Sequence, residues 1–193
     1  GIHELDAFVR EGGTLVALSR ASDFVVEALE LPVENVVGEL GSGEFFAGGS
    51  ILEVRTDTTQ PVMAGMPGRA AVFFDRSPVF TTGEGFEGRA LAAWEEEGSP
   101  LLSGYLLGEE HLQRRAAALE VRHGRGRVVL LGFRPQWRGQ PFGTFRILFN
   151  AALFTRAVAE AAPDNPDFWT APEGADGGER SGGNGGGGGA GGG

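Results

Sequence analysis

Two places in this sequence put polar side chains directly after an apolar run of strand length. Ser19 follows the run 14–18. The second place follows the run 126–131, where a polar loop contains Arg134, Gln136, Trp137 and Arg138. Ligands of open α/β sheets bind at the carboxyl ends of the strands, where such loops lie. Both places are therefore candidates for a ligand-binding or interdomain surface.

Ser19 has the position of a nucleophile at a sharp strand-to-helix turn. Such a turn needs small flanking residues, whereas the neighbours of Ser19 are Leu18 and Arg20. A nucleophilic serine also needs a base, and no histidine lies in a predicted strand-end loop. We interpret Ser19 as a structural or capping residue. A residual serine hydrolase that uses Ser19 stays as an alternative.

Other motifs do not indicate a cofactor or metal site. Residues 83–88 match G-x-G-x-x-G, but a strand-like run follows them, and their two glutamates would repel a pyrophosphate, so we read them as a surface hairpin turn. His3, His111 and His123 are far apart in the sequence, and none belongs to an H-E-x-x-H or H-x-x-E pattern. We therefore predict no catalytic residue, no cofactor and no metal ion in this chain.

The composition excludes several function classes. The chain has 193 residues, a formal net charge of −10, no cysteine, and 16 cationic residues that are all arginine. The acidic balance argues against nucleic acid binding, which needs a basic face. The missing cysteines and lysines exclude disulfides, thiolate zinc sites and Schiff-base chemistry. We expect no membrane span, because no apolar run is long enough, and the amino end lacks a signal-peptide pattern, so the location stays open.

The elements that position the candidate residues alternate between helix and strand. Residues 2–11 have an apolar helical face, residues 14–18 are typical of a buried strand, and a second helix begins near Ser22. A final helix is expected at 144–159. Its core-facing stripe would consist of Phe145, Leu148, Phe149, Ala152 and Leu153. This order is that of a doubly wound α/β sheet.

The middle of the chain contains an irregular stretch and several closely spaced strands. Residues 31–50 have no helical or alternating period, which predicts an irregular excursion over the sheet. A short helix is expected at 101–112, and a hairpin should form across the turn at Gly124. Strands are expected at 51–55, 70–74, 90–94 and 117–122. Their close spacing predicts some antiparallel or mixed pairing.

The composition changes after residue 161 to proline, aspartate, glutamate and glycine, and residues 181–193 are almost entirely glycine. Such a segment cannot bury enough apolar surface to offset its ordering entropy. We predict an α/β domain over 1–160 and a flexible acidic, then glycine-rich, tail over 161–193. Because the sequence begins inside a helix-like segment, we expect the domain to lack its amino-terminal part.

Two segments resemble class I glutamine amidotransferases. Residues 8–29 resemble the segment that carries the nucleophilic cysteine of that family, and residues 132–136 resemble its strand-end motif with the catalytic histidine and glutamate. On this matching Ser19 falls at the cysteine, Arg134 at the histidine and Gln136 at the glutamate. Arginine stays protonated and glutamine has no carboxylate, so neither acts as a base. The resemblance implies a flavodoxin-like, mostly parallel sheet without amidotransferase chemistry.

A second resemblance covers about residues 1–153 and rests on separated motifs at 57–67, 73–80, 108–112 and 126–136 together with the following helix. These motifs look like the C-terminal region of certain large bacterial carboxypeptidase A-like zinc peptidases. The resemblance implies a non-catalytic accessory domain whose partner is the peptidase domain of the same polypeptide. It places the zinc in that absent domain, and it implies a secreted or periplasmic location.

One alternative is a small-molecule or carbohydrate-binding module of the same fold. An open pocket lined by Ser19, Arg134 and Gln136 would favour that alternative. A Trp137 that fills this edge of the sheet would instead favour packing of the loop against another domain.

Overall fold

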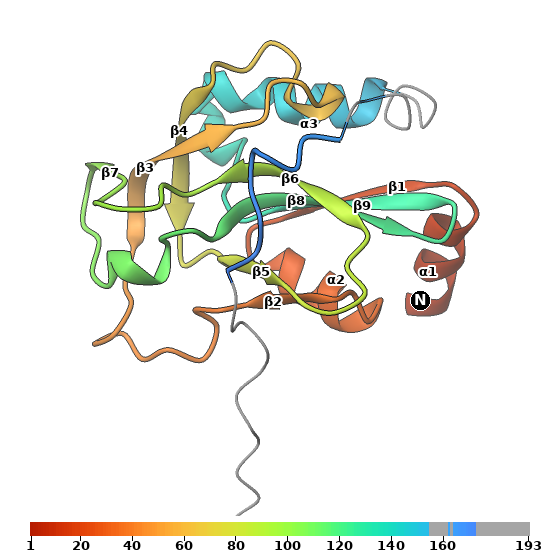
Figure 1. The fold of residues 1–193 in the computed structure, drawn as a ribbon, viewed down its shortest axis with the longest axis horizontal. Helices are drawn as coiled ribbons and strands as arrows, with labels where there is room; N and C mark the ends of the chain where they lie inside the picture. The colour runs from red at the N-terminus through yellow and green to blue at the C-terminus, as the bar shows by residue number, and fades with distance from the viewer. Residues whose placement is uncertain (155–161, 163, 173–193) are drawn as a thin grey trace, which may run out of the picture.

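The computed structural model describes residues 1–154, 162 and 164–172. Within them, helices lie on both sides of one mixed β-sheet (Figure 1). The main path of the sheet has the strand order β1-β9-β8-β6-β3-β4, while β5 pairs with β2 and β8, and β7 pairs with β3. The helices and strands are α1 (Ile2–Arg10), β1 (Thr14–Leu18), α2 (Ala21–Ala28), β2 (Val33–Asn35), β3 (Gly48–Thr56), β4 (Arg69–Asp75), β5 (Phe80–Thr82), β6 (Gly88–Ala93), β7 (Leu101–Ser103), β8 (Ala116–His123), β9 (Gly126–Leu131) and α3 (Phe145–Leu153).

The α/β class and the mixed pairing agree with the sequence-based prediction. Strands β1 and β9 are parallel, with Thr14 opposite Arg127 and Leu18 opposite Leu131. The other strand pairs of the described residues are antiparallel, so the antiparallel share is larger than expected. The reason is that no α-helix lies between β2 and β9, and parallel neighbours need a long crossover connection. The predicted hairpin across Gly124 is confirmed as the β8–β9 pair.

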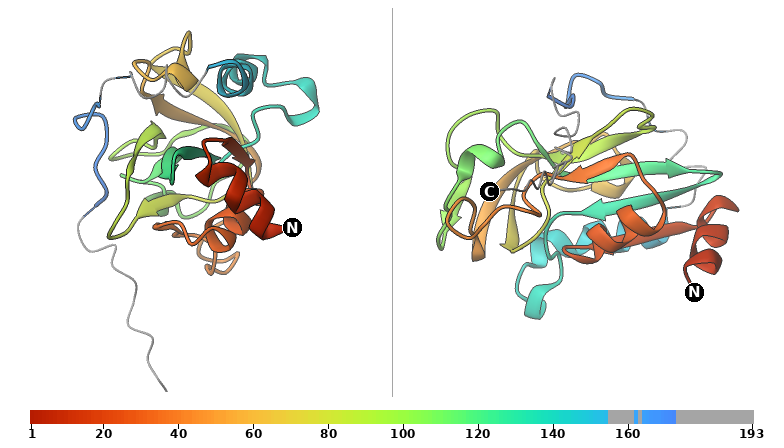
Figure 2. Two further views of the ribbon diagram at one scale, coloured as in Figure 1. Left: turned by 90° about the vertical axis from the view of Figure 1, so that its right-hand side faces the viewer. Right: turned by 90° about the horizontal axis from the view of Figure 1, so that it is seen from below.

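Strand β9 is apolar at consecutive positions because both faces of the sheet are covered there. Val128 and Leu130 belong to a core cluster that includes residues of α1 and α2. Val129 and Leu131 belong to the cluster on the opposite face, which includes residues of α3. Figures 1 and 2 show α1 and α2 on one side of the sheet and α3 on the other. Strands buried on both faces have this continuous hydrophobic pattern.

The predicted inward face of α3 is correct only at Leu148, which packs against the core cluster on this side of the sheet. The side chains that α3 buries are Ile147, 1% exposed, and Ala151, 4% exposed, whereas Phe149 is 62% and Leu153 75% exposed. Phe145 and Leu148 are half-buried and Ala152 is exposed. The helix has apolar residues on more than one face, and periodicity does not tell which of them meets the sheet. Residues 155–159 of the predicted helix lie outside the described residues.

The predicted helix over 101–112 is also wrong. Residues 101–103 form the exposed strand β7, which pairs with β3, and only residues 109–111 make a 3-10 turn. Gly104 lies between the strand and the turn and has a φ of 101°, a conformation that residues other than glycine rarely adopt. The four strands predicted between residues 51 and 122 are present as β3, β4, β6 and β8. Much of 31–50 is irregular, as predicted, although it also contains β2 and the start of β3.

Part of the predicted tail packs on the sheet. Asn165 Nδ2 donates to Asp57 Oδ1 at 3.1 Å, and Trp169 Nε1 donates to the Arg114 carbonyl at 2.8 Å. Phe168 and Trp169 pack against a core cluster. The apolar area that they bury offsets the entropy lost when this segment is ordered, which the polar residues around them could not do. Residues 164–172 of the predicted tail thus contact the folded part of the chain, and the flexibility of the tail stays a prediction. Residues 161, 163 and 173–193 of the predicted tail lie outside the described residues.

The two faces of α3 give a matched pair of substitutions. Ile147→Ala should lower the free energy of unfolding by about 2–5 kcal/mol, because it opens a cavity in the core. Phe149→Ala should change it by no more than about 0.5 kcal/mol, because that ring is largely exposed. Urea unfolding followed by circular dichroism measures both. Equal losses for the two variants would contradict this orientation of α3.

Helix α1 is tied to the β8–β9 hairpin by a carboxylate and an imidazole. Asp6 Oδ1 lies 2.5 Å from His123 Nε2, and the hydrogen bond with His123 is the main cause that lowers the pKa of Asp6. A carboxylate whose folded pKa is lowered stabilises the fold above its unfolded pKa and loses this effect as pH falls through the folded pKa. The stability difference between wild type and Asp6→Asn should therefore shrink from about pH 5 to about pH 2. Urea unfolding at each pH measures this stability difference, with Glu4→Gln on the same helix as the control. A difference that stays constant with pH would contradict the prediction.

Candidate functional site

The parallel pairing of β1 and β9 brings the two sequence-predicted places to one edge of the sheet. The Ser19 N–H donates to the carbonyl of Leu131, the last residue of β9, at 2.7 Å. Ser19 is buried and has a φ of 50°, which is uncommon for a non-glycine residue and marks the sharp end of β1. The loop 134–138 begins three residues after Leu131.

The hydroxyl of Ser19 is bonded to another hydroxyl rather than to a base. Ser19 Oγ lies 2.8 Å from Ser77 Oγ, and Ser77 Oγ donates to the Asp75 carbonyl at 3.3 Å. Serine nucleophiles need a histidine, lysine or amine that accepts their proton. His123 instead contacts Asp6, and His111 lies in a 3-10 turn on the surface. Ser19 thus has the geometry of a structural residue.

Arg134 is held in place by side chains of β4 and by its own loop. Its Nη2 lies 3.0 Å from Asp75 Oδ2, and its backbone N–H donates to the Phe73 carbonyl at 2.9 Å. Its guanidinium carbon lies 4.4 Å from the centre of the Trp137 ring. The Trp137 ring stacks on Phe73, with ring centres 5.6 Å apart and an angle of 10°. The loop is therefore packed onto β4.

The other two residues predicted for this loop, Gln136 and Arg138, are not part of this packing. Gln136 and Arg138 are exposed, and the Arg138 guanidinium lies 5.4 Å from the centre of the Trp137 ring. Arg134 and Trp137 thus belong to one cluster with β4, Ser19 reaches the same strand end through Ser77, and Gln136 and Arg138 face outward.

Asp75 and Ser77 are two residues of this edge that the sequence-based prediction missed. The available signal was the position of Asp75 at the end of the strand-like run 70–74, the same argument that singled out Ser19. These two residues link the Ser19 and Arg134 parts of the edge.

A cavity of about 470 Å³ lies beside this edge, and the irregular segment 37–47 forms much of its wall. Arg20, Arg76 and Ser77 also line it, whereas Ser19, Arg134 and Gln136 do not. Asp23 lines it as well, and burial raises the pKa of this carboxyl group although Asn35 Nδ2 donates to it at 3.0 Å. This cavity is therefore not the pocket that would have favoured a binding module at Ser19 and Arg134, and Trp137 stacks on Phe73 of β4 at this edge.

The glycine-rich segment 83–88 and the histidines do not form a binding site. Residues 83–88 connect β5 to β6, which do not pair with each other, so the predicted hairpin is wrong, and the segment leads into a strand instead of a helix. A phosphate-binding loop needs the helix N-terminus. Among the described residues no group of three or more His, Asp or Glu side chains is placed to hold a metal ion. No helix of this part of the chain is long and apolar enough to cross a membrane.

Comparisons with known proteins give distant structural likenesses. No family model matches, and no curated protein matches by sequence. A GMP synthase-like protein from Thermoplasma acidophilum matches 82% of this chain and 64% of its own, at 9% identity and a TM-score of 0.49. A β-galactosidase from Bacillus circulans sp. alkalophilus matches 78% of this chain and 20% of its own, at 12% identity and a TM-score of 0.47. A ThuA-like protein from Bacteroides uniformis matches 78% of this chain and 61% of its own, at 11% identity and a TM-score of 0.38. The chain spans less than two thirds of each of these proteins.

The hydroxyl pair at the strand end gives a double-mutant test. Ser19→Ala and Ser77→Ala should lower the free energy of unfolding by about 0.5–1.5 kcal/mol for each hydrogen bond lost, because Ser19→Ala removes the bond between the two hydroxyls and Ser77→Ala removes this bond and the one to the Asp75 carbonyl. The double variant should lose less than the sum, because both single variants remove the same bond. A fluorophosphonate probe should leave Ser19 unlabelled, as seen by mass spectrometry. Covalent labelling of Ser19 would contradict its structural role.

Proposed function

We propose that this chain is a non-catalytic accessory domain, of class I glutamine amidotransferase-like fold, that belongs to a secreted or periplasmic zinc metallocarboxypeptidase. In this proposal the peptidase domain of the same polypeptide carries the proteolysis. The chain packs against that domain and supports or positions it.

The chemistry of the strand-end edge supports a non-catalytic role. The family's three catalytic positions hold Ser19, Arg134 and Gln136 on the matching given above. Ser19 is bonded to Ser77, and Arg134 is paired with Asp75 and covered by Trp137. Neither guanidinium nor amide accepts a proton at neutral pH. The same contacts disfavour the residual hydrolase that would use Ser19.

The observation that carries the packing role is an exposed apolar patch on α3 and the turn before it. The patch consists of Phe142, Phe149 and Leu153, which are 75%, 62% and 75% exposed. Phe145 packs edge-on against Phe142, with ring centres 5.5 Å apart. Soluble proteins seldom expose large apolar groups together unless a partner covers them. Covering each side chain would contribute about 1.5–3 kcal/mol.

The patch continues into a groove and into the predicted loop. Residues 140–144 and β4 border a cavity of about 410 Å³ whose lining includes Met66 and Phe73. Trp137 stacks on the same Phe73, and the exposed Arg138 lies over Trp137. Aromatic and arginine side chains around an apolar centre are typical of protein interfaces. The loop 134–138 would form the polar rim of this interface.

In this proposal the zinc ion is bound by the peptidase domain and not by this chain. The described residues offer no cluster of ligands for it, so we assign no step of a metal-dependent reaction to them. The peptide substrate would be chosen by the peptidase domain.

The reading frame of the gene gives the first test. We expect the sequence that precedes this chain to encode a peptidase domain with an H-x-x-E zinc motif. A gene without such a domain would overturn the proposal.

Binding between the two domains gives the second test. The chain should bind the purified peptidase domain, and Phe149→Asp with Leu153→Asp should weaken the binding at least about tenfold, because two charges replace the centre of the patch. The matched control is Phe24→Asp, which changes an exposed phenylalanine of α2 on the opposite side of the sheet. Surface plasmon resonance measures the affinities. Equal affinities for both variants would place the interface elsewhere.

A further inference from the structure

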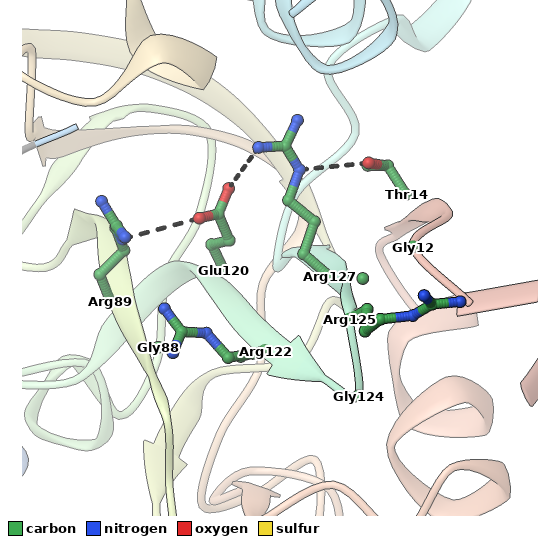
Figure 3. A pocket seen from close by; sticks show the side chains of 10 residues that line it. Gly12, Thr14, Gly88, Arg89, Glu120, Arg122, Gly124, Arg125 and Arg127 are labelled. Atoms are coloured by element: carbon green, nitrogen blue, oxygen red, sulfur yellow. Dashed lines mark hydrogen bonds and ion pairs between the residues drawn. The ribbon is translucent and has the colours of Figure 1, made fainter. Parts of the chain in front are cut away.

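A second polar cavity, of about 460 Å³, lies at the opposite edge of the sheet, where β1 and β9 begin. We call it the arginine pocket and define it by five of its lining residues: Arg89, Glu120, Arg122, Arg125 and Arg127 (Figure 3). None of them stands out in the sequence, because they are spread over three strands and a turn, 38 positions apart at the extremes.

The strand register places four of these side chains on one face of the sheet. Arg89 of β6 lies opposite Glu120 of β8, and Arg122 of β8 lies opposite Arg127 of β9. Glu120 and Arg122 are two residues apart on one strand and so point to the same face. Two like charges directly opposite each other on neighbouring strands are unfavourable without a counter-charge. A nearby anion would therefore stabilise the Arg122–Arg127 pair.

Glu120 supplies only part of that counter-charge. Its Oε1 lies 3.6 Å from Arg89 Nε, and its Oε2 lies 3.6 Å from Arg127 Nη1, distances too long for hydrogen bonds. Burial raises the pKa of Glu120 in spite of the lowering effect of Arg127, Arg89 and Arg122. Asp164 also lies 3.8 Å from Arg89 Nη2, but its side chain is highly exposed. The four guanidinium groups that line the cavity thus outnumber these two carboxylates.

Arg127 is the most buried arginine of the pocket, and one of its guanidinium nitrogens, Nη1, donates no hydrogen bond to any residue that the structure describes. It is only 6% exposed. Its Nε donates to Thr14 Oγ1 at 3.2 Å and its Nη2 to the Phe154 carbonyl at 3.0 Å. Its buried Nη1 has no hydrogen-bond acceptor among the described residues. A buried guanidinium nitrogen without an acceptor is costly, and an oxyanion in the cavity would satisfy it.

Arg122 and Arg125 add charge that the internal network does not need. Both are exposed at the rim of the cavity, and for neither is there a side-chain ion pair within the described part of the chain. They are not members of the Arg89–Glu120–Arg127 network of ion pairs. Their charge is therefore available to an anion bound in the cavity.

We propose that the arginine pocket binds a small oxyanion with at least two negative charges, such as a phosphate group or a di- or tricarboxylate. Arg127 donates from the buried end, since guanidinium groups bind such oxygens with paired hydrogen bonds, and Arg122 and Arg125, whose side chains extend to opposite sides of the cavity in Figure 3, add positive charge at the rim. The site lies at the opposite edge from Ser19 and Arg134, so it does not depend on the proposed accessory role.

Calorimetric titration of the full chain at constant ionic strength tests the site, with inorganic phosphate, citrate and sodium chloride as separate ligands. Phosphate or citrate should bind with a dissociation constant below about 1 mM, and chloride should give no binding heat. Binding of phosphate alone would indicate a phosphoryl ligand, and binding of citrate alone a carboxylate ligand. Absence of binding by both would overturn the proposal.

The variant Arg122→Gln/Arg125→Gln locates the binding. It should fold like wild type because both side chains are exposed, which its circular dichroism spectrum and thermal midpoint check. It should bind the anion at least about tenfold more weakly, because it removes two positive charges from the rim of the cavity. The matched control is Arg138→Gln, an exposed arginine at the other edge, which should bind like wild type. Equal weakening by both changes would show a non-specific charge effect and overturn the assignment.

Discussion

The parallel pairing of β1 with β9 is the constraint on which the rest of the structure depends. Every residue of β9 from Val128 to Leu131 is fully buried, half of them against α1 and α2 and half against α3. Burying such side chains contributes about 1.5–3 kcal/mol each, so the register of this strand is strongly held. Because Leu18 lies opposite Leu131 and Thr14 opposite Arg127, the same register determines which polar groups meet at each edge of the sheet.

The two edges differ in how their polar groups are satisfied. At the carboxyl edge Ser19 pairs with Ser77, and Arg134 pairs with Asp75 and lies against Trp137, so the groups satisfy one another. At the amino edge the guanidinium groups outnumber the carboxylates, and within the described part of the chain the buried Nη1 of Arg127 has no acceptor. At the edge where α/β sheets usually bind ligands, the predicted side chains Ser19 and Arg134 thus have partners within the chain, and the unsatisfied charge lies at the other edge.

Helix α3 shows how one element can serve both the core and a surface. Ile147 and Ala151 face the sheet, while Phe149 and Leu153 face away from it. An apolar side chain that the fold does not bury contributes little to the stability of the chain by itself. In our proposal this outer face packs against the peptidase domain, which would explain why the helix is apolar on more than one face.

The sequence by itself determined the α/β class, the strands around residues 51–55, 70–74, 90–94 and 117–122, and the β8–β9 hairpin. Local periodicity and turn residues carry this information. Only the tertiary structure decided that most strand pairs are antiparallel, that residues 164–172 pack on the sheet, and that Phe149 faces outward. The tertiary structure alone brought Asp75 to Arg134 and gathered Arg89, Arg122 and Arg127 around Glu120. Pairing partners and the inward face of a helix depend on contacts between residues far apart in the chain, and a local pattern holds no record of those contacts.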